Sequence, residues 1–95
     1  MIEIEKISGI GEFIKKVEKE REIFLVDEKA FLVRNKNTIE VRCDRELSKL
    51  LQEKYESVME SRYFGRGGIE VVMSGQLDDN EIEDLIRLSY NLTKD

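Results

Sequence analysis

The fold of this protein is decided by residues 23–43, which read IFLVDEKAFLVRNKNTIEVRC. Two short runs, 23–26 and 30–33, are continuously apolar, as expected of strands that are buried on both faces. The third run, 38–43, alternates polar and apolar residues, so one side should be buried and the other hydrated. Only short polar segments separate the three runs, which is typical of tight turns. The stretch therefore predicts three consecutive strands in an antiparallel meander.

Upstream of the meander, the sequence predicts a helix over residues 10–17. Its apolar residues follow the spacing i, i+3, i+4, i+7, which places one stripe along about three helical turns. These residues are Ile10, Phe13, Ile14 and Val17. Residues 1–7 alternate weakly, with three isoleucines on one side, and we interpret them as a short edge strand or a loose leader.

Downstream of the meander, a second helix should begin after Asp44, whose carboxylate can accept hydrogen bonds from the first helical turn. Its expected apolar stripe consists of Leu47, Leu50, Leu51 and Tyr55. Residues 58–64 are extended in character, and residues 69–73 form another strand. Between them, three glycines in the four positions 65–68 predict a flexible hairpin loop.

The last helix has the strongest local signal. Asp78 and Glu81 have the spacing of a capping box, and Leu77 and Ile82 have that of a hydrophobic staple. The expected buried stripe consists of Ile82, Leu85, Ile86 and Leu92, with Leu88 or Tyr90 at its edge. Helices separated by antiparallel strands indicate a single α+β domain over residues 1–95. We expect a two-layer sandwich, with the helices packed on one face of an antiparallel sheet.

The composition excludes several classes of function. The chain has no His and one Cys, so neither a His-based catalytic triad nor an intramolecular disulfide can form. No catalytic constellation is visible, and we expect a protein that is not an enzyme and needs no cofactor or metal. No apolar run approaches the roughly 20 residues of a membrane span, and the N-terminus does not resemble a signal peptide. These features predict a cytoplasmic protein without a membrane association.

Three stretches resemble the YjbR/MmcQ family of small proteins. They read IEVRCDREL at 39–47, LQEKY at 51–55 and SGQLDDNE at 74–81, the last leading to SYNL at 89–92. The resemblance implies a CyaY-like (frataxin-like) fold and a DNA-binding role described for a double-wing arrangement. The chain departs from the family pattern at 62–69, RYFGRGGI, which lacks the usual Asn-Lys-x-x-Trp stretch.

The charge distribution indicates where DNA would bind. The whole chain has a net charge of −5, yet residues 29–68 hold nine basic and six acidic residues. Phosphate neutralisation dominates nucleic-acid affinity, so we expect weak, salt-sensitive binding through the sheet and the hairpin at 62–68, both of which draw on this segment. The candidate nucleic-acid-binding residues are Arg34, Lys36, Arg42, Arg62, Tyr63 and Arg66. Tyr63 or Phe64 would lie against a base or sugar.

Each candidate has a plainer interpretation. The basic residues are equally those of a solvated sheet face, and the domain would then be a protein-interaction module that uses its acidic C-terminal helix or the sheet. The acidic residues of 78–84 are explained by capping and the helix dipole. Cys43 lies on the apolar side of its strand and should behave as a small hydrophobe. Nothing in the sequence indicates an oligomeric state.

Overall fold

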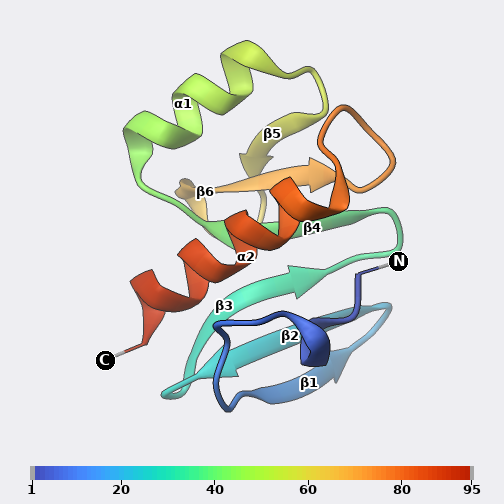
Figure 1. Ribbon diagram of the computed structural model, residues 1–95, viewed down its shortest axis with the longest axis vertical. Helices are drawn as coiled ribbons and strands as arrows, with labels where there is room; N and C mark the ends of the chain where they lie inside the picture. Colours follow the sequence, from blue (N-terminus) through green and yellow to red (C-terminus); the bar gives the residue numbers. More distant parts are fainter. Residues whose placement is uncertain (1, 95) are drawn as a thin grey trace.

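A computed structural model describes residues 2–94 of the chain. Its centre is an antiparallel sheet of six strands in the order β1-β2-β3-β4-β6-β5 (Figure 1). The strands are β1 (Ile14–Glu18), β2 (Arg21–Val26), β3 (Lys29–Arg34), β4 (Thr38–Arg42), β5 (Val58–Ser61) and β6 (Gly65–Val72). The helices are α1 (Arg45–Lys54) between β4 and β5, and α2 (Asp79–Thr93) after β6. In residues 2–94, no helix is long and apolar enough to cross a membrane.

The predicted meander is confirmed as β2, β3 and β4. The turn between β2 and β3 has positive φ angles at both central residues, 50° at Asp27 and 67° at Glu28. Two such residues in a two-residue turn match the right-handed twist of the strands that they join. Neither position is glycine, so sheet pairing on both sides holds a conformation that the residues themselves disfavour.

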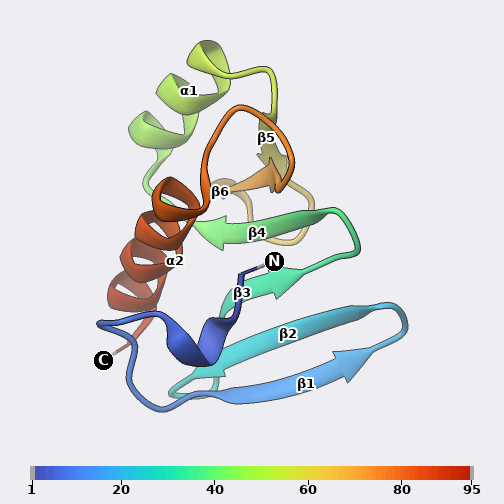
Figure 2. The same cartoon turned by 45° about the vertical axis from the view of Figure 1, so that its right-hand side comes forward.

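Cross-strand rows define the two faces of the sheet. Phe24, Leu32, Val41 and Ile69 are neighbours across four strands and belong to the main core. Both helices and the N-terminal segment lie over this covered face (Figure 2). The predicted two-layer α+β sandwich is therefore confirmed. The opposite face, which we call the open face, carries the row Ile23, Val33, Glu40 and Glu70.

The helix predicted over residues 10–17 is wrong, because Ile14–Glu18 forms edge strand β1 and pairs with β2. Ile14 and Val17 are 66% and 68% exposed, so the helical spacing does not mark a buried stripe. Both are β-branched and fit a strand. The backbone hydrogen bonds that a helix would make internally are made instead with β2. Only Phe13 and Ile10 of the predicted stripe pack against the main core.

Residues 2–7 form neither a strand nor a loose leader, and residue 1 of the predicted segment lies outside the described residues. Ile4–Lys6 is a single 3₁₀ turn. Ile2, Ile4 and Ile7 share one side, as their alternation indicated, and all three are buried in the main core. Burial of three isoleucines explains why so short a segment is held against the covered face.

The apolar stripes of the two helices are narrower than expected. On α1, Leu47 and Leu51 pack against the core, but Leu50 is 61% exposed. On α2, Ile82 and Ile86 are fully buried and Leu85 partly, whereas Leu92 is 54% exposed and was wrongly predicted to be buried. Polar side chains fill part of the buried face of α2. Ser89, for example, donates to the Phe31 carbonyl and accepts from the Arg42 amide.

The glycine-rich segment 65–68 is not the hairpin loop that the sequence predicted. It is the first half of β6, and the turn between β5 and β6 is formed by residues 62–64. A Cβ on Gly68 would come within 2.6 Å of both Phe64 Cβ and the Val41 carbonyl oxygen. Glycine is therefore required there by close packing rather than by chain flexibility.

The predicted capping box at the start of α2 is confirmed, and it provides a stability test. Asp78 accepts from the Glu81 amide at 2.8 Å, and Glu81 accepts from the Asp78 amide at 3.2 Å. Asp78→Ala should lower the free energy of unfolding by about 1 kcal/mol, because it removes the acceptor and a charge at the positive end of the helix dipole. Asp78→Asn, which keeps the acceptor, should stay within a few tenths of wild type in urea denaturation. Equal losses in both variants would contradict the capping role.

Candidate ligand-binding face of the sheet

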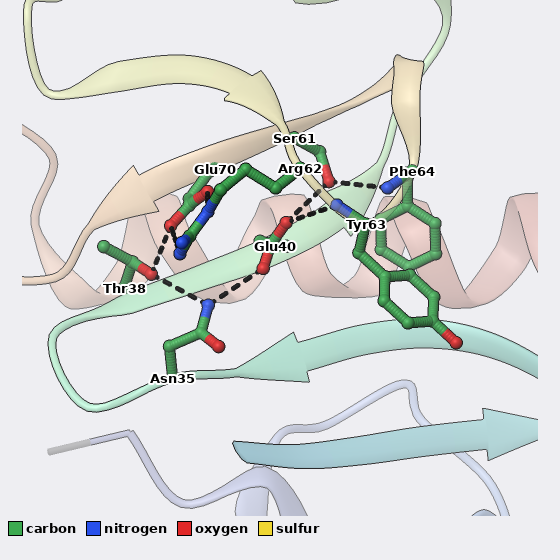
Figure 3. Close-up of polar contacts among 8 residues, drawn as sticks. All are labelled: Asn35, Thr38, Glu40, Ser61, Arg62, Tyr63, Phe64 and Glu70. Atoms are coloured by element: carbon green, nitrogen blue, oxygen red, sulfur yellow. Dashed lines mark hydrogen bonds and ion pairs between the residues drawn. The ribbon is translucent and has the colours of Figure 1, made fainter. Parts of the chain in front are cut away.

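Two buried carboxylates lie side by side at the centre of the open face. Glu40 on β4 and Glu70 on β6 are direct cross-strand neighbours, and they are 1% and 4% exposed. They organise eight residues, which we call the Glu40–Glu70 network (Figure 3). Its members are Asn35, Thr38, Glu40, Ser61, Arg62, Tyr63, Phe64 and Glu70. Buried carboxylates are stable only when they are paired or fully hydrogen-bonded, so each of these two depends on the partners that surround it.

Glu70 is neutralised by an arginine. Arg62 donates from Nε at 2.9 Å and from Nη2 at 2.7 Å, in a two-pronged contact, and Thr38 Oγ1 donates at 2.8 Å. Burial opposes ionisation of Glu70, but the hydrogen bonds from Arg62 and Thr38 outweigh it and hold the pKa below its ordinary value. The same pairing raises the pKa of Arg62. Glu70 is therefore ionised at neutral pH.

Glu40 is held by uncharged donors instead. It accepts from Asn35 Nδ2 at 2.9 Å, from Ser61 Oγ at 2.9 Å and from the Tyr63 amide at 2.8 Å. Ser61 Oγ in turn accepts from the Phe64 amide at 2.8 Å. In residues 2–94, every buried side-chain nitrogen and oxygen has a hydrogen-bond partner. The Tyr63 amide is therefore hydrogen-bonded directly to the Glu40 carboxylate, and the Phe64 amide is linked to it through Ser61.

The network determines where the aromatic residues of the turn lie. Phe64 packs against a second small core on the open face, formed by Ile23, Ala30 and Val33. Tyr63 contacts Phe64 edge-on at 4.9 Å between ring centroids, yet remains 42% exposed. The Arg21 guanidinium lies 5.3 Å from the centre of the Tyr63 ring. The turn therefore presents one accessible aromatic ring in a preorganised position.

The sequence pattern was wrong about Glu40. Alternation within residues 38–43 placed Glu40 on the hydrated side of its strand, and that side does face away from the helices. It is nevertheless buried, because the 62–64 turn folds back over the open face. Strand periodicity predicts which face a residue lies on, but not whether a distant turn covers it. The sequence feature closest to an indication that Glu40 is buried is a second glutamate, Glu70, within a later strand.

A hollow of about 1050 Å³ lies beside this turn, and we call it the sheet-face hollow. Its walls come from the β1–β2 turn, the β3–β4 turn and the β5–β6 turn. It is lined by Glu18, Lys19, Glu20, Arg21, Asn35, Lys36, Glu40, Arg62 and Tyr63. Four cations and three carboxylates thus line the hollow together with Tyr63, and one of these carboxylates, Glu40, is buried.

The structure brings together only part of the predicted nucleic-acid surface. Lys36, Arg62 and Tyr63 line the sheet-face hollow. Arg34 lies on the covered face, where it pairs with Glu22 at 2.6 Å and donates to the Ile2 carbonyl. The hydrogen bond from Arg34, together with Lys15 and despite burial, lowers the pKa of Glu22. Arg34 therefore does not line the sheet-face hollow with Tyr63, although it lines an adjoining hollow that shares Lys19, Arg21 and Lys36 with it.

The two remaining candidates lie elsewhere. Arg42 is on the open face but is already engaged: Nε donates to the Ala30 carbonyl at 2.8 Å, and the guanidinium lies 5.0 Å from the Phe64 ring centroid. Arg66 is exposed and lines a different hollow, next to α1.

Cys43 is buried, and burial with the nearby Asp44 raises the pKa of its thiol to about 11, which is unfavourable for a nucleophile.

The lowered pKa values of Glu22 and Glu70 predict a dependence of stability on pH. A carboxyl whose pKa is lower in the folded state contributes stability above its unfolded value, 4.5 here, and loses it as pH falls through the folded value. The free energy of unfolding should therefore decrease between about pH 5 and pH 2. In Glu22→Gln/Glu70→Gln this decrease should be clearly smaller, as measured by urea denaturation. A slope equal to that of wild type would contradict the assignment.

The fold and the site define a small α+β domain with one helix-covered face and one open face that bears a preorganised turn. A family model described as YjbR matches residues 12–92. The chain therefore belongs to the YjbR family, as the resemblance of its motifs indicated. A search of curated proteins finds no match to this chain.

Two solved structures are similar to this domain. A structural-genomics target from Pseudomonas syringae has a TM-score of 0.74 and 17% identity, covering 86% of this chain and 87% of its own. A Deinococcus radiodurans protein with a DUF419 domain has a TM-score of 0.71 and 15% identity, covering 90% of this chain and 71% of its own. At these identities the likeness concerns the fold, and it agrees with the family assignment.

Proposed function

We propose that this protein is a non-enzymatic domain that binds DNA weakly through the sheet-face hollow. The observation that supports the proposal is the exposed Tyr63 ring, held by the Glu40–Glu70 network among Lys19, Arg21 and Lys36. Stacking of a base on an aromatic ring contributes about 1–3 kcal/mol and requires an unpaired base. Single-stranded DNA should therefore bind more tightly than a duplex of the same sequence.

The charges around the sheet-face hollow determine how tightly DNA is expected to bind. Arg62 is committed to Glu70, and Arg21 lies 3.5 Å from Glu18, so Lys19 and Lys36 are the cations of this hollow left to neutralise phosphates. Two phosphate contacts to a single strand correspond to a slope of log affinity against log salt of about −1.4. Because the chain as a whole is acidic, association should be weak and detectable mainly at low salt.

The test is a fluorescence-anisotropy titration of a labelled mixed-sequence single strand, with the duplex in parallel. Tyr63→Ala should weaken binding by roughly tenfold, whereas Tyr63→Phe keeps the ring and should bind like wild type. Lys19→Ala/Lys36→Ala should flatten the salt slope by about 1.4. The matched control is Lys6→Ala/Lys94→Ala, which removes the same charge from the helix side of the sheet and should keep the wild-type slope.

Protein interaction is the second candidate function, and the exposed side of α2 favours it. Leu88 and Leu92 lie one helical turn apart and are both exposed, beside acidic residues such as Asp84. Absence of DNA binding at micromolar protein and low salt, or equal salt slopes in the two lysine variants, would remove the DNA proposal. The leucine pair would then make a protein partner the better-supported function.

A further inference from the structure

Two of the seven arginines have no partner among residues 2–94. In residues 2–94, Arg21, Arg34, Arg62 and Arg87 each pair with a carboxylate, and Arg42 bonds to a carbonyl and contacts Phe64. Within the same residues, no hydrogen bond, ion pair or ring contact is recorded for Arg45 or Arg66. The chain has more acidic than basic residues, so unpaired guanidinium groups are not a consequence of a shortage of carboxylates.

Both of these arginines line the same hollow. It has a volume of about 450 Å³, lies between α1 and the β5–β6 pair, and we call it the α1–β6 hollow. Lys49 lies one helical turn after Arg45 on α1 and is a third cation of this hollow. It too has no hydrogen-bond or ion-pair partner among residues 2–94. The complete lining is Arg45, Ser48, Lys49, Gln52, Glu53, Glu60 and Arg66. None of these residues belongs to the sheet-face hollow.

The position of α1 on the sheet is well defined. Ser48 is buried, and its Oγ donates to the Gly68 carbonyl at 3.2 Å while accepting from Gln52 Nε2 at 3.0 Å. These bonds connect α1 to β6 two residues away from Arg66. The backbones that carry Arg45, Lys49 and Arg66 are thus held at a fixed separation, with only the long side chains free to adjust to a ligand.

We propose that the α1–β6 hollow is a binding site for a phosphate group. Planar guanidinium groups suit the oxygen pairs of phosphate, and a lysine adds a mobile point charge. Glu53 and Glu60 also line the hollow, so the lining carries a net charge of only +1 and offers acceptors as well as donors. Their carboxylates can accept hydrogen bonds from the amino groups of a nucleobase or from ribose hydroxyls, so we expect a phosphate ester that carries a nucleoside. Such a group is found both in a free nucleotide and in a nucleic-acid strand.

The test is a titration followed by the amide NMR signals of α1 and β6, at constant ionic strength. The probes are inorganic phosphate, AMP and the single strand used for the sheet-face hollow. In wild type, AMP or the strand should shift the signals of residues 45–52 and 66–68 more strongly than inorganic phosphate. Arg45→Ala/Arg66→Ala should weaken this binding roughly tenfold, because charge-assisted hydrogen bonds are lost. Arg45→Lys/Arg66→Lys should recover only part of it.

Two controls separate this site from general charge effects and from the proposed DNA function. Arg21→Ala/Arg87→Ala removes two arginines that already have carboxylate partners, so AMP binding should be retained. Lys19→Ala/Lys36→Ala should also retain AMP binding, even where it reduces the affinity for the strand. Shifts with AMP assign the site to a nucleotide, and shifts with the strand alone assign it to nucleic acid. The proposal is overturned if Arg45→Ala/Arg66→Ala changes neither, a result that leaves the sheet-face proposal intact.

Discussion

Replacement of Phe31 by alanine should lower the free energy of unfolding by about 3–5 kcal/mol. Phe31 is fully buried at the centre of the main core. Its ring lies 5.1 Å from Tyr90, edge-on at 88°, and 6.2 Å from Phe13. Truncation would leave a cavity between β3, α2 and the N-terminal segment, which meet around this ring.

The measurement is urea denaturation followed by circular dichroism. Phe31→Leu retains most of the volume and should lose clearly less stability, so it provides a measurable variant if Phe31→Ala does not fold. Leu50→Ala is the exposed control and should stay within about 0.5 kcal/mol of wild type. A loss below about 1 kcal/mol in Phe31→Ala would contradict the central position assigned to this ring.

Glu40→Ala should destabilise the protein by about 3–5 kcal/mol, although a polar residue is being removed from a β-strand. The substitution deletes the acceptor of Asn35, Ser61 and the Tyr63 amide, and it leaves donors without partners in a buried region. Unsatisfied buried donors each cost about 1–3 kcal/mol. An exposed glutamate two strands away on β5, Glu60, serves as the control, and Glu60→Ala should have little effect.

A second readout distinguishes loss of the network from general destabilisation. The Tyr63 amide proton should exchange with solvent much faster in Glu40→Ala, because its acceptor is gone. Glu40→Gln keeps one oxygen for the Ser61 and Tyr63 donors, so its exchange rate should lie closer to that of wild type. An unchanged Tyr63 exchange rate in Glu40→Ala would show that the carboxylate does not hold the turn. The preorganised position of the Tyr63 ring, on which the proposed DNA function rests, would then lose its support.

The candidate site was only partly predictable. Lys36, Arg62 and Tyr63 were identified from charge and aromatic content, and they do line one hollow. Arg34 was grouped with them because it lies in the same net-positive segment, 29–68, but strand alternation places it on the covered face with Glu22. Which arginine finds a carboxylate depends on residues up to 12 positions away in these pairs, and composition carries no such information.

The sequence by itself determined the elements that rest on local interactions. The β2–β3–β4 meander follows from short apolar runs separated by turns, and Asp44 and Asp78 cap their helices because the bonds span only two or three residues. Only the tertiary structure decided that residues 14–18 are a strand, that Glu40 is buried and that Gly68 must be glycine. Each of those outcomes depends on a partner from another segment, namely β2, the 62–64 turn and Val41. Periodicity describes one segment at a time, whereas burial is a property of the segments that meet.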